Sequence, residues 1–377
     1  MRNPTTRPGF TLVELMVAMA LTLFVMVILS QAFVMAIETF SGMKGIGDMQ
    51  QNLRTASVLL RDDLIEDHFE GKRRLSDVAM LPTGPTAAIV NQRPMQGFFA
   101  IGQYTPTITE GTDANAMPSY RATSNVLYMT VKRKGNRTEN FFSNVLLGDA
   151  AVLSSFFAQP TAYNIPASPN MPSLTWASVY QAGATQGFYN SQWAEVLYYL
   201  VQTGTTEEPN IPTSTNGTPT FSLYRAQFGM VPDATSVNGK FVSGLEGTTF
   251  AQLSCNASAG GVEFYTPTDA AKIGAPKRML PDLATFSVTG RFSPTASVAV
   301  PVPVPTLVLP NVISFHVQAK ALISAAAPNF VDVSLYDTTK FGVAGYTNNG
   351  LKGVQITLRV WDPKTRQTRQ ITVVQDL

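Results

Sequence analysis

Residues 9–15 read Gly-Phe-Thr-Leu-Val-Glu-Leu, and an apolar run without charges follows from Leu15 to Ile37. A run of about 20 apolar residues is long enough to cross the hydrocarbon core of a bilayer as a helix. Glu14 is the one carboxylate at the head of this run, where an ionised side chain is costly unless it finds a partner. The sequence therefore predicts a cationic partner for Glu14.

The short leader before this run suggests where that cation comes from. It ends at Gly9 and carries Arg2 and Arg7 but no acid. If the chain is cut after Gly9, the new α-amino group on Phe10 lies about one helical turn from Glu14. The two charges then pair within one helix or, in a packed array, between neighbouring subunits. Basic residues before the run also place the leader in the cytoplasm and the rest of the chain outside.

The segment from Gly9 to Glu14 resembles, residue for residue, the class III signal of type IV pilins and of type II secretion pseudopilins. The resemblance implies that a prepilin peptidase cleaves the chain after Gly9 and methylates the new N-terminus at Phe10. It also implies that Glu14 is the glutamate on which filament assembly depends in that family.

Two ordinary explanations of the apolar run fit less well. A secretory signal has a shorter apolar core, followed by a small-residue cleavage site. Here the core is longer, and Ser30-Gln31-Ala32 is a poor match to such a site. A plain single-pass anchor fits the length but leaves Glu14 unexplained.

The amino-acid composition limits the classes of function that the protein can have. Charged residues make up 14% of the 377 residues, as expected of a β-rich extracytoplasmic protein. Without Arg2 and Arg7 the basic residues number 27 − 2 = 25 and equal the 25 acidic ones, so the processed chain is formally neutral. Neutrality gives no general affinity for nucleic acid. The single cysteine, Cys255, cannot form an internal disulfide, and we expect it to be a partly buried small side chain.

The helix that begins at Phe10 is predicted to continue beyond the apolar run and to end near Glu70 and Gly71. Apolar residues recur at steps of three or four, at Met49, Leu53, Ala56, Leu60 and Leu64. Three glycines separate the apolar and amphipathic halves: Gly42, Gly45 and Gly47. Each glycine costs a helix about 1 kcal/mol relative to alanine. The segment is therefore either a softened joint that lets a head tilt on its stem or a plain junction between two helical halves.

The remainder of the chain is predicted to form strands. Residues 98–101 are a short apolar run, and residues 125–131 and 141–147 are predicted to pair as a hairpin across a basic turn at 132–137. That turn is a candidate contact for nucleic acid or lipid, although hairpin tips are commonly charged for solubility. A second hairpin is predicted between residues 193–201 and 221–228. Further strands are predicted at 283–292, 311–319, 330–336, 353–362 and 369–374, with extended backbone at 301–305.

Nothing in the sequence predicts a catalytic site or a cofactor. Only two histidines exist, His68 on the helix and His316 on the more polar face of a strand, and no nucleotide-binding or zinc motif is present. The acids Asp62, Asp63, Glu66 and Asp67 are interpreted as a solvated flank of the helix, with a metal site as the alternative. Asp332, Asp337 and Asn348 are the only suggestive calcium ligands. We therefore expect a protein that is not an enzyme.

The strands extend the resemblance modestly. The segments 198–199, 223–225 and 353–362 look like those of the J-type minor pseudopilin of type II secretion and equally like those of the W-type minor pilin of type IV pili. The implied fold is α+β and pilin-like, with a long N-terminal α-helix, membrane-spanning in its first half, packed on an antiparallel β-sheet head. The chain is longer than is usual for that group, and the additional length is predicted to form extra loops around 150–190 and 229–280.

We expect four regions: a leader at 1–9, a membrane and filament-core helix at 10–37, an amphipathic continuation at 38–70, and a periplasmic head at 71–377. The implied function is assembly at the tip of a pseudopilus that drives protein secretion; the alternative is a minor pilin that primes pilus assembly, adhesion or DNA uptake. The implied partners are a prepilin peptidase, other minor and major pseudopilins or pilins, an inner-membrane assembly platform and membrane lipid. Nucleic acid is not an expected partner.

Overall fold

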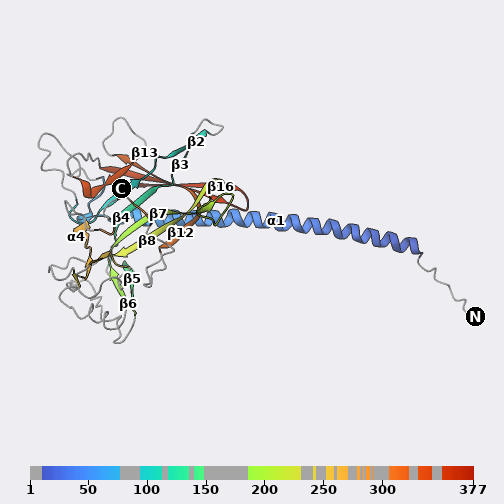
Figure 1. The fold of residues 1–377 in the computed structure, drawn as a ribbon, viewed down its shortest axis with the longest axis horizontal. Helices are drawn as coiled ribbons and strands as arrows, with labels where there is room; N and C mark the ends of the chain where they lie inside the picture. Colours follow the sequence, from blue (N-terminus) through green and yellow to red (C-terminus); the bar gives the residue numbers. More distant parts are fainter. Residues whose placement is uncertain are drawn as a thin grey trace, which may run out of the picture.

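A computed structural model shows a long helix that projects from a β-rich head (Figure 1). It describes residues 11–76, 94–112, 118–135, 140–147, 186–230, 241–242, 252–258, 261–270, 278–280, 283, 286–288, 292, 305–321, 330–341 and 350–377. The α+β architecture predicted from the sequence, a long N-terminal helix followed by an antiparallel head, is confirmed.

Helix α1 (Leu12–Ile65) is a single α-helix that includes the three glycines without a break. It ends five residues before the predicted end, because Glu66 adopts an extended conformation. The next residue, Asp67, pairs with the end of a strand, where the Lys132 N–H donates to the Asp67 carbonyl at 2.7 Å. A short 3-10 helix, η1 (Glu70–Lys72), follows and contains Gly71 at a φ of 67°, in the left-handed region that favours glycine.

The head is built on a large antiparallel sheet with nine described strands. Its hydrogen-bonded order is β14 (Leu335–Asp337), β1 (Phe99–Gln103), β4 (Asn125–Lys132), β7 (Trp193–Thr205), β8 (Pro219–Gly229), β12 (Thr306–Ala321), β15 (Leu351–Asp362) and β16 (Gln367–Asp376), with β13 (Val331–Asp332) paired to β12.

Smaller elements surround this sheet in the described part of the chain. They are the pair β2 (Ile108–Thr112) and β3 (Pro118–Arg121), the pair β5 (Phe142–Leu147) and β6 (Gln186–Ser191), the triplet β10 (Cys255–Ser258), β11 (Gly261–Phe264) and β9 (Phe241–Val242), the short helix α4 (Pro267–Ala270) and the 3-10 helix η9 (Thr338–Lys340).

Two apolar clusters cover opposite faces of strands β1, β4, β7 and β8. Residues that alternate along β4 divide between them: Leu127 and Met129 face the cluster under helix α1, whereas Val126 and Tyr128 face the other. The amphipathic half of α1 contributes its predicted apolar residues to the first cluster, and Leu60 is completely buried. Burial of each such large side chain stabilises the fold by about 1.5–3 kcal/mol. The helix is therefore part of the core of the head.

Several strand predictions are confirmed. The hairpin predicted between 193–201 and 221–228 is β7 and β8, which pair along their whole length. The strands predicted at 311–319, 353–362 and 369–374 are β12, β15 and β16, in which β15 and β16 form a hairpin across a turn at 363–366. Cys255, which was expected to be partly buried, is almost fully buried in β10.

The first predicted hairpin is wrong. Strand β4 pairs with β1 and β7, while β5 pairs with β6 in a separate two-stranded sheet. Just beyond β4, the Arg133 N–H donates to the Gln192 carbonyl at 2.9 Å, which continues the pairing of β4 with β7 and not with β5. The long apolar strand β7 then occupies the neighbouring position that was predicted for 141–147.

Two other predictions need correction. Residues 330–336 form two short strands, β13 and β14, that pair with different neighbours, β12 and β1. The predicted strand at 283–292 is absent from its described residues 283, 286–288 and 292. Their apolar side chains pack instead on the cluster that contains Val126 and Tyr128. The predicted extended segment at 301–305 lies outside the described residues except for its last proline.

Candidate functional site

Thr11 and Glu14 close the N-terminal end of helix α1. The Thr11 hydroxyl oxygen accepts a hydrogen bond from the Glu14 N–H at 3.3 Å. In return, the Glu14 carboxylate accepts hydrogen bonds from the backbone N–H and the hydroxyl of Thr11, both at 2.9 Å. This capping box satisfies backbone donors that have no partner within the helix. Glu14 thus has a neutral partner inside its own chain.

The predicted pairing of Glu14 with an α-amino group stays a prediction. Gly9 and Phe10, the predicted cleavage and methylation site, lie outside the described residues. The capping box nevertheless restricts the possibilities, because the Glu14 carboxylate that would meet a cation is already held by Thr11. Any new partner must exchange with Thr11 or share the carboxylate with it.

The first half of α1 has no contact with the head. Every residue from 12 to 41 is exposed, and Leu15 and Ile37, the ends of the predicted span, are 55% and 65% exposed. Among the described residues α1 is the one helix long and apolar enough to cross a membrane. An apolar surface of this extent is unfavourable in water, so lipid or other protein chains must cover it. We refer to residues 12–41 as the stem.

Helix α1 meets the head just beyond the stem, at its glycines. A Cβ on Gly42 would lie 3.7 Å from a methyl carbon of Thr365, and a Cβ on Gly45 would lie 2.7 Å from Oδ2 of Asp362. The Asp362 carboxylate cannot easily move, because it accepts hydrogen bonds from the Lys364 N–H at 3.0 Å and the Thr365 hydroxyl at 2.8 Å. Gly45 therefore allows a close approach of helix and turn, a role that the sequence alone did not reveal.

The far end of α1 is held by a buried charge. Asp63 is 5% exposed, so the prediction of a solvated acidic flank is wrong for this residue. Its carboxylate accepts hydrogen bonds from Nε and Nη2 of Arg225 and from the Tyr198 hydroxyl. Burial, and then the nearby Asp63 carboxylate, raise the pKa of Tyr198, so this hydroxyl remains a donor. Strands β7 and β8 thus fix the helix at the centre of the sheet.

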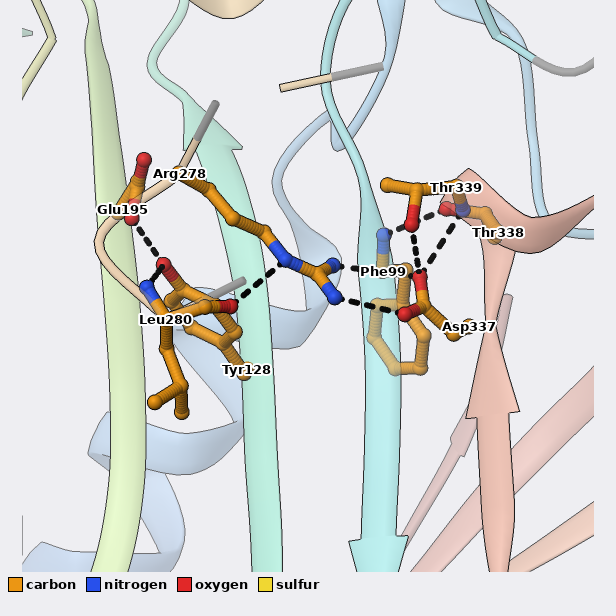
Figure 2. A network of polar contacts seen from close by, with 8 residues as sticks. All are labelled: Phe99, Tyr128, Glu195, Arg278, Leu280, Asp337, Thr338 and Thr339. Atoms are coloured by element: carbon orange, nitrogen blue, oxygen red, sulfur yellow. Dashed lines mark hydrogen bonds and ion pairs between the residues drawn. The ribbon is translucent and has the colours of Figure 1, made fainter. Parts of the chain in front are cut away.

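A second buried ion pair lies on the opposite face of the sheet (Figure 2). Arg278 is completely buried and donates to both oxygens of the Asp337 carboxylate, at 2.7 and 3.2 Å. Asp337 also accepts hydrogen bonds from the N–H and the hydroxyl of Thr339 at 3.0 and 2.7 Å. The guanidinium therefore connects residues 278–280 with strand β14.

Figure 2 also shows a buried carboxylate close to the same arginine. The Tyr128 hydroxyl donates to Glu195, and the Leu280 N–H donates to the Tyr128 oxygen at 3.2 Å. The Ser254 hydroxyl, which is not drawn, also donates to Glu195. Burial raises the pKa of Glu195. These groups form hydrogen bonds with one another and hold residues 278–280 against β4 and β7. We therefore interpret their role as structural.

The two histidines are not arranged for nucleophilic catalysis. The His68 ring bonds the Thr130 carbonyl through Nδ1 at 2.8 Å, and burial lowers the pKa of His68. His316 bonds Asp332 through Nε2 at 2.7 Å. In the described ranges neither ring is hydrogen-bonded to a serine, threonine or cysteine side chain, the pairing that would activate a nucleophile.

The suggested calcium ligands are not brought together where the structure describes them. Asp332 lies beside His316, Asp337 is paired with Arg278, and Asn348 is outside the described residues. In the described part of the chain no group of three or more metal-ligating side chains gathers.

The described cations of the basic turn are used within the head. The Lys132 ammonium lies 5.0 Å from the centre of the Trp193 ring, and the Arg133 guanidinium lies 4.2 Å from that of Phe142. Lys134 forms a 3.0 Å ion pair with Asp67. These contacts stabilise the end of β4, and they weaken the interpretation of the turn as a nucleic-acid contact.

Comparison with known proteins identifies a family model that matches the N-terminal part of the chain. A family model described as the prokaryotic N-terminal methylation motif matches residues 6–30. It covers the cleavage site expected after Gly9, the capping box of Glu14 and much of the exposed stem. No curated protein and no solved structure matches the chain.

Proposed function

We propose that this type IV pilin-like protein is a minor pseudopilin of a type II secretion system, which assembles at the tip of the periplasmic pseudopilus and helps to initiate it. The observation that carries the proposal is the coincidence of the methylation motif with a stem that is exposed on every face. The motif implies processing by a prepilin peptidase and assembly with other pilins. The stem requires a cover that lipid supplies before assembly and neighbouring stems supply afterwards.

In this proposal the subunit first resides in the inner membrane. The peptidase removes residues 1–9 and methylates Phe10, the stem spans the bilayer, and the head lies in the periplasm. The capping box keeps Glu14 partnered during this stage, because Thr11 donates two hydrogen bonds to the carboxylate. A buried carboxylate with good partners is far less costly than an isolated one.

Assembly then changes the surroundings of Glu14. In a bundle of stems the methylated amine of a neighbouring Phe10 becomes the cation that pairs with the Glu14 carboxylate. Burial of both charges is tolerable only when they meet, because an unpaired buried charge is strongly destabilising. The pair therefore selects one register between neighbouring stems. The apolar stems contribute the contact area between neighbouring subunits, and Glu14 determines how those stems align.

The head is proposed to act through its surface and not through catalysis. Two described buried acids are paired with buried bases, Asp63 with Arg225 and Asp337 with Arg278, and the buried Glu195 accepts hydrogen bonds from Tyr128 and Ser254. Rigid buried pairs of this kind fix a surface for contact with other minor subunits.

The proposal is tested by crosslinking the protein in its native envelope, purifying it and identifying the attached proteins by mass. We expect other pseudopilins and the inner-membrane platform of a secretion system. Recovery with a major pilin and a retractable pilus apparatus would instead identify a minor pilin that primes pilus assembly. Recovery of neither group would leave a simple membrane anchor and overturn the proposal.

A further inference from the structure

The turn between β15 and β16, residues 363–366, is the part of the described head that meets α1 closest to the apolar run. Residues 12–41 are all exposed, and Gly42 is the first position along α1 that the head partly covers. The neighbour of Gly42 is Thr365, in the middle of this turn. Figure 1 shows the β15–β16 hairpin, in red, extending along α1 to the end of the head from which the stem emerges.

Helix geometry gives the height of the turn above a membrane. The apolar run ends at Ile37, and a helix rises 1.5 Å per residue, so Gly42 and Gly45 lie about 7.5 and 12 Å beyond the run. The polar headgroups of a bilayer add about 5–7 Å to each side of its hydrocarbon core. If the apolar run spans the core, the turn therefore lies at the outer boundary of the headgroup layer.

The turn presents positive charge at this level. Lys364 and Arg366 are exposed, as is Lys44 on the adjacent turn of α1. None of the three forms an ion pair with a residue that the structure describes. Two carboxylates lie nearby: Asp362, which is 8% exposed and accepts hydrogen bonds from within the turn, and Asp48, which is exposed and lines the adjacent groove. Lysine and arginine near an anionic membrane surface are attracted to lipid phosphates.

The backbone of the turn adds an independent observation. Arg366 has a φ of 53°, in the left-handed region where glycine is favoured and other residues are uncommon. Its N–H closes the turn by donating to the Asp362 carbonyl at 2.8 Å. A glycine would adopt this conformation more easily, and the arginine that stands there is exposed.

A groove opens beside the turn, between α1 and the sheet. It has a volume of about 210 Å³, and its lining includes Met49, Pro310, Trp361 and Pro363. The Trp361 residue is partly exposed while its indole N–H is buried, and Asp48 and Asn52 also line the groove. The apolar part of this lining can contact the glycerol and upper acyl region of a lipid whose phosphate is held by the turn.

We propose that the β15–β16 turn is a lipid-headgroup contact, in which Lys364 and Arg366, together with Lys44, bind the phosphates of anionic lipids while the subunit resides in the membrane. The inference rests on the membrane residence included in the proposed function. It goes beyond that function by assigning the head its own membrane-binding surface. Entry into a filament would break these contacts, so they favour the membrane-resident state.

The test places a fluorescent label at either end of one strand. Gln367→Cys lies beside the turn, and Gln375→Cys lies on the same strand about 27 Å away, at 3.4 Å per residue. Cys255 is buried, so labelling of the native full chain is directed to the new cysteine. The labelled chain is reconstituted into phosphatidylcholine vesicles with or without phosphatidylglycerol, which also contain a lipid with a nitroxide quencher on its headgroup.

We expect strong quenching at position 367, little at 375, and an increase at 367 when phosphatidylglycerol is present. The variant K364Q/R366Q should lower the ratio of docked to undocked heads about fivefold for each cation removed. Lys352→Gln, at the opposite end of β15, is the matched control and should have no effect. Arg366→Gly should reduce quenching without disturbing the turn, because glycine adopts its backbone conformation readily.

Equal quenching at positions 367 and 375, or no response to lipid charge and to K364Q/R366Q, would overturn the inference. Extraction with alkaline carbonate separates this failure from failure of its premise. A chain that stays in the vesicles after carbonate treatment resides in the membrane, and a negative quenching result then rejects the headgroup contact alone. A chain released by carbonate rejects the membrane residence itself.

Discussion

Arg225 on strand β8 donates two hydrogen bonds, of 2.7 and 3.0 Å, to the carboxylate of Asp63 on helix α1. Both side chains are less than a tenth exposed. The pair joins residues 162 positions apart and holds the last turn of the helix against the sheet. It is therefore the charged counterpart of the apolar contacts that α1 makes along the same face.

Replacement of Asp63 by alanine should destabilise the head by about 3–5 kcal/mol, because it leaves Arg225 buried without a countercharge. Urea unfolding of the full chain in detergent measures the change. Asp62→Ala is the control, since Asp62 is the exposed neighbour and should change the free energy of unfolding by less than about 0.5 kcal/mol. Equal effects of the two substitutions would mean that the ion pair does not stabilise the fold.

Glu195 should make the head less stable as the pH rises. Burial raises its pKa above the ordinary value of 4.5, so the folded state holds this proton more tightly than the unfolded state does. This contribution to stability is complete below pH 4.5 and is lost as the pH rises through the folded-state pKa. Glu195→Gln removes the titration but retains an amide that can bond Tyr128 and Ser254.

The measurement is the difference in unfolding free energy between the native chain and Glu195→Gln across this pH range. Taking the difference removes the contributions of other groups, including the buried His68. The difference should shift in favour of the variant with rising pH above 4.5. A difference that does not change with pH would show that the pKa of Glu195 is the same in the folded and unfolded states.

Gly45 and Gly47 of helix α1 should respond to replacement by alanine in opposite ways. Gly47→Ala has no described neighbour within 4 Å of the new methyl group and should stabilise the helix by about 1 kcal/mol. Gly45→Ala would place the methyl group 2.7 Å from the Asp362 carboxylate, so it should lose this gain and destabilise the junction. Thermal unfolding of the two variants compares them directly. Stabilisation by both would show that Asp362 moves aside at no cost.

Replacement of Gly9 by valine should block leader removal, since the resemblance places the cleavage after this glycine. The intact mass of the purified chain measures the outcome, because an uncleaved chain keeps the mass of residues 1–9. Asn3→Ala, elsewhere in the leader, is the control and should be processed normally. Normal processing of the Gly9 variant would place the cleavage elsewhere.

Glu14→Ala should leave cleavage intact but reduce the fraction of subunits that crosslink to other pilins, because the register-selecting charge is lost. Loss of the capping box should also weaken the first turn of α1 by about 1 kcal/mol. Glu38→Ala, at the opposite end of the apolar run, controls for removal of a stem carboxylate. Normal crosslinking by Glu14→Ala would refute the charge-pairing mechanism.

The features that the sequence predicts well are those set by local pattern. The apolar run and the steps of three or four from Met49 to Leu64 predict α1, and alternation predicts β12, β15 and β16, because each pattern reports one buried face. The β7–β8 hairpin is predicted because its strands are consecutive neighbours. The β4–β5 hairpin fails because the partner of β4 is decided by competition with β7, which lies much further along the chain.

The buried charges could not be predicted from local pattern. Asp63 lies three residues after Leu60 and seven after Ala56, which places it on the buried face of the helix. This spacing was the available signal, but its partner Arg225 has no recognisable relation to it in the sequence. Likewise, Gly45 gives no indication of Asp362, and Arg278 gives none of Asp337. Such pairs are set by the tertiary fold.

The continuity of α1 has a mechanical consequence. Its 54 residues form one rod, about 80 Å long at 1.5 Å per residue, that serves both as the stem and as a wall of the core. A force on the stem acts along the axis of that rod. It therefore loads the contacts from Met49 to Leu64 simultaneously, in shear, and does not break them one after another. The Asp63–Arg225 ion pair at the far end of the helix resists sliding of α1 along the sheet. Tension applied to the stem is therefore transmitted to the head as a whole.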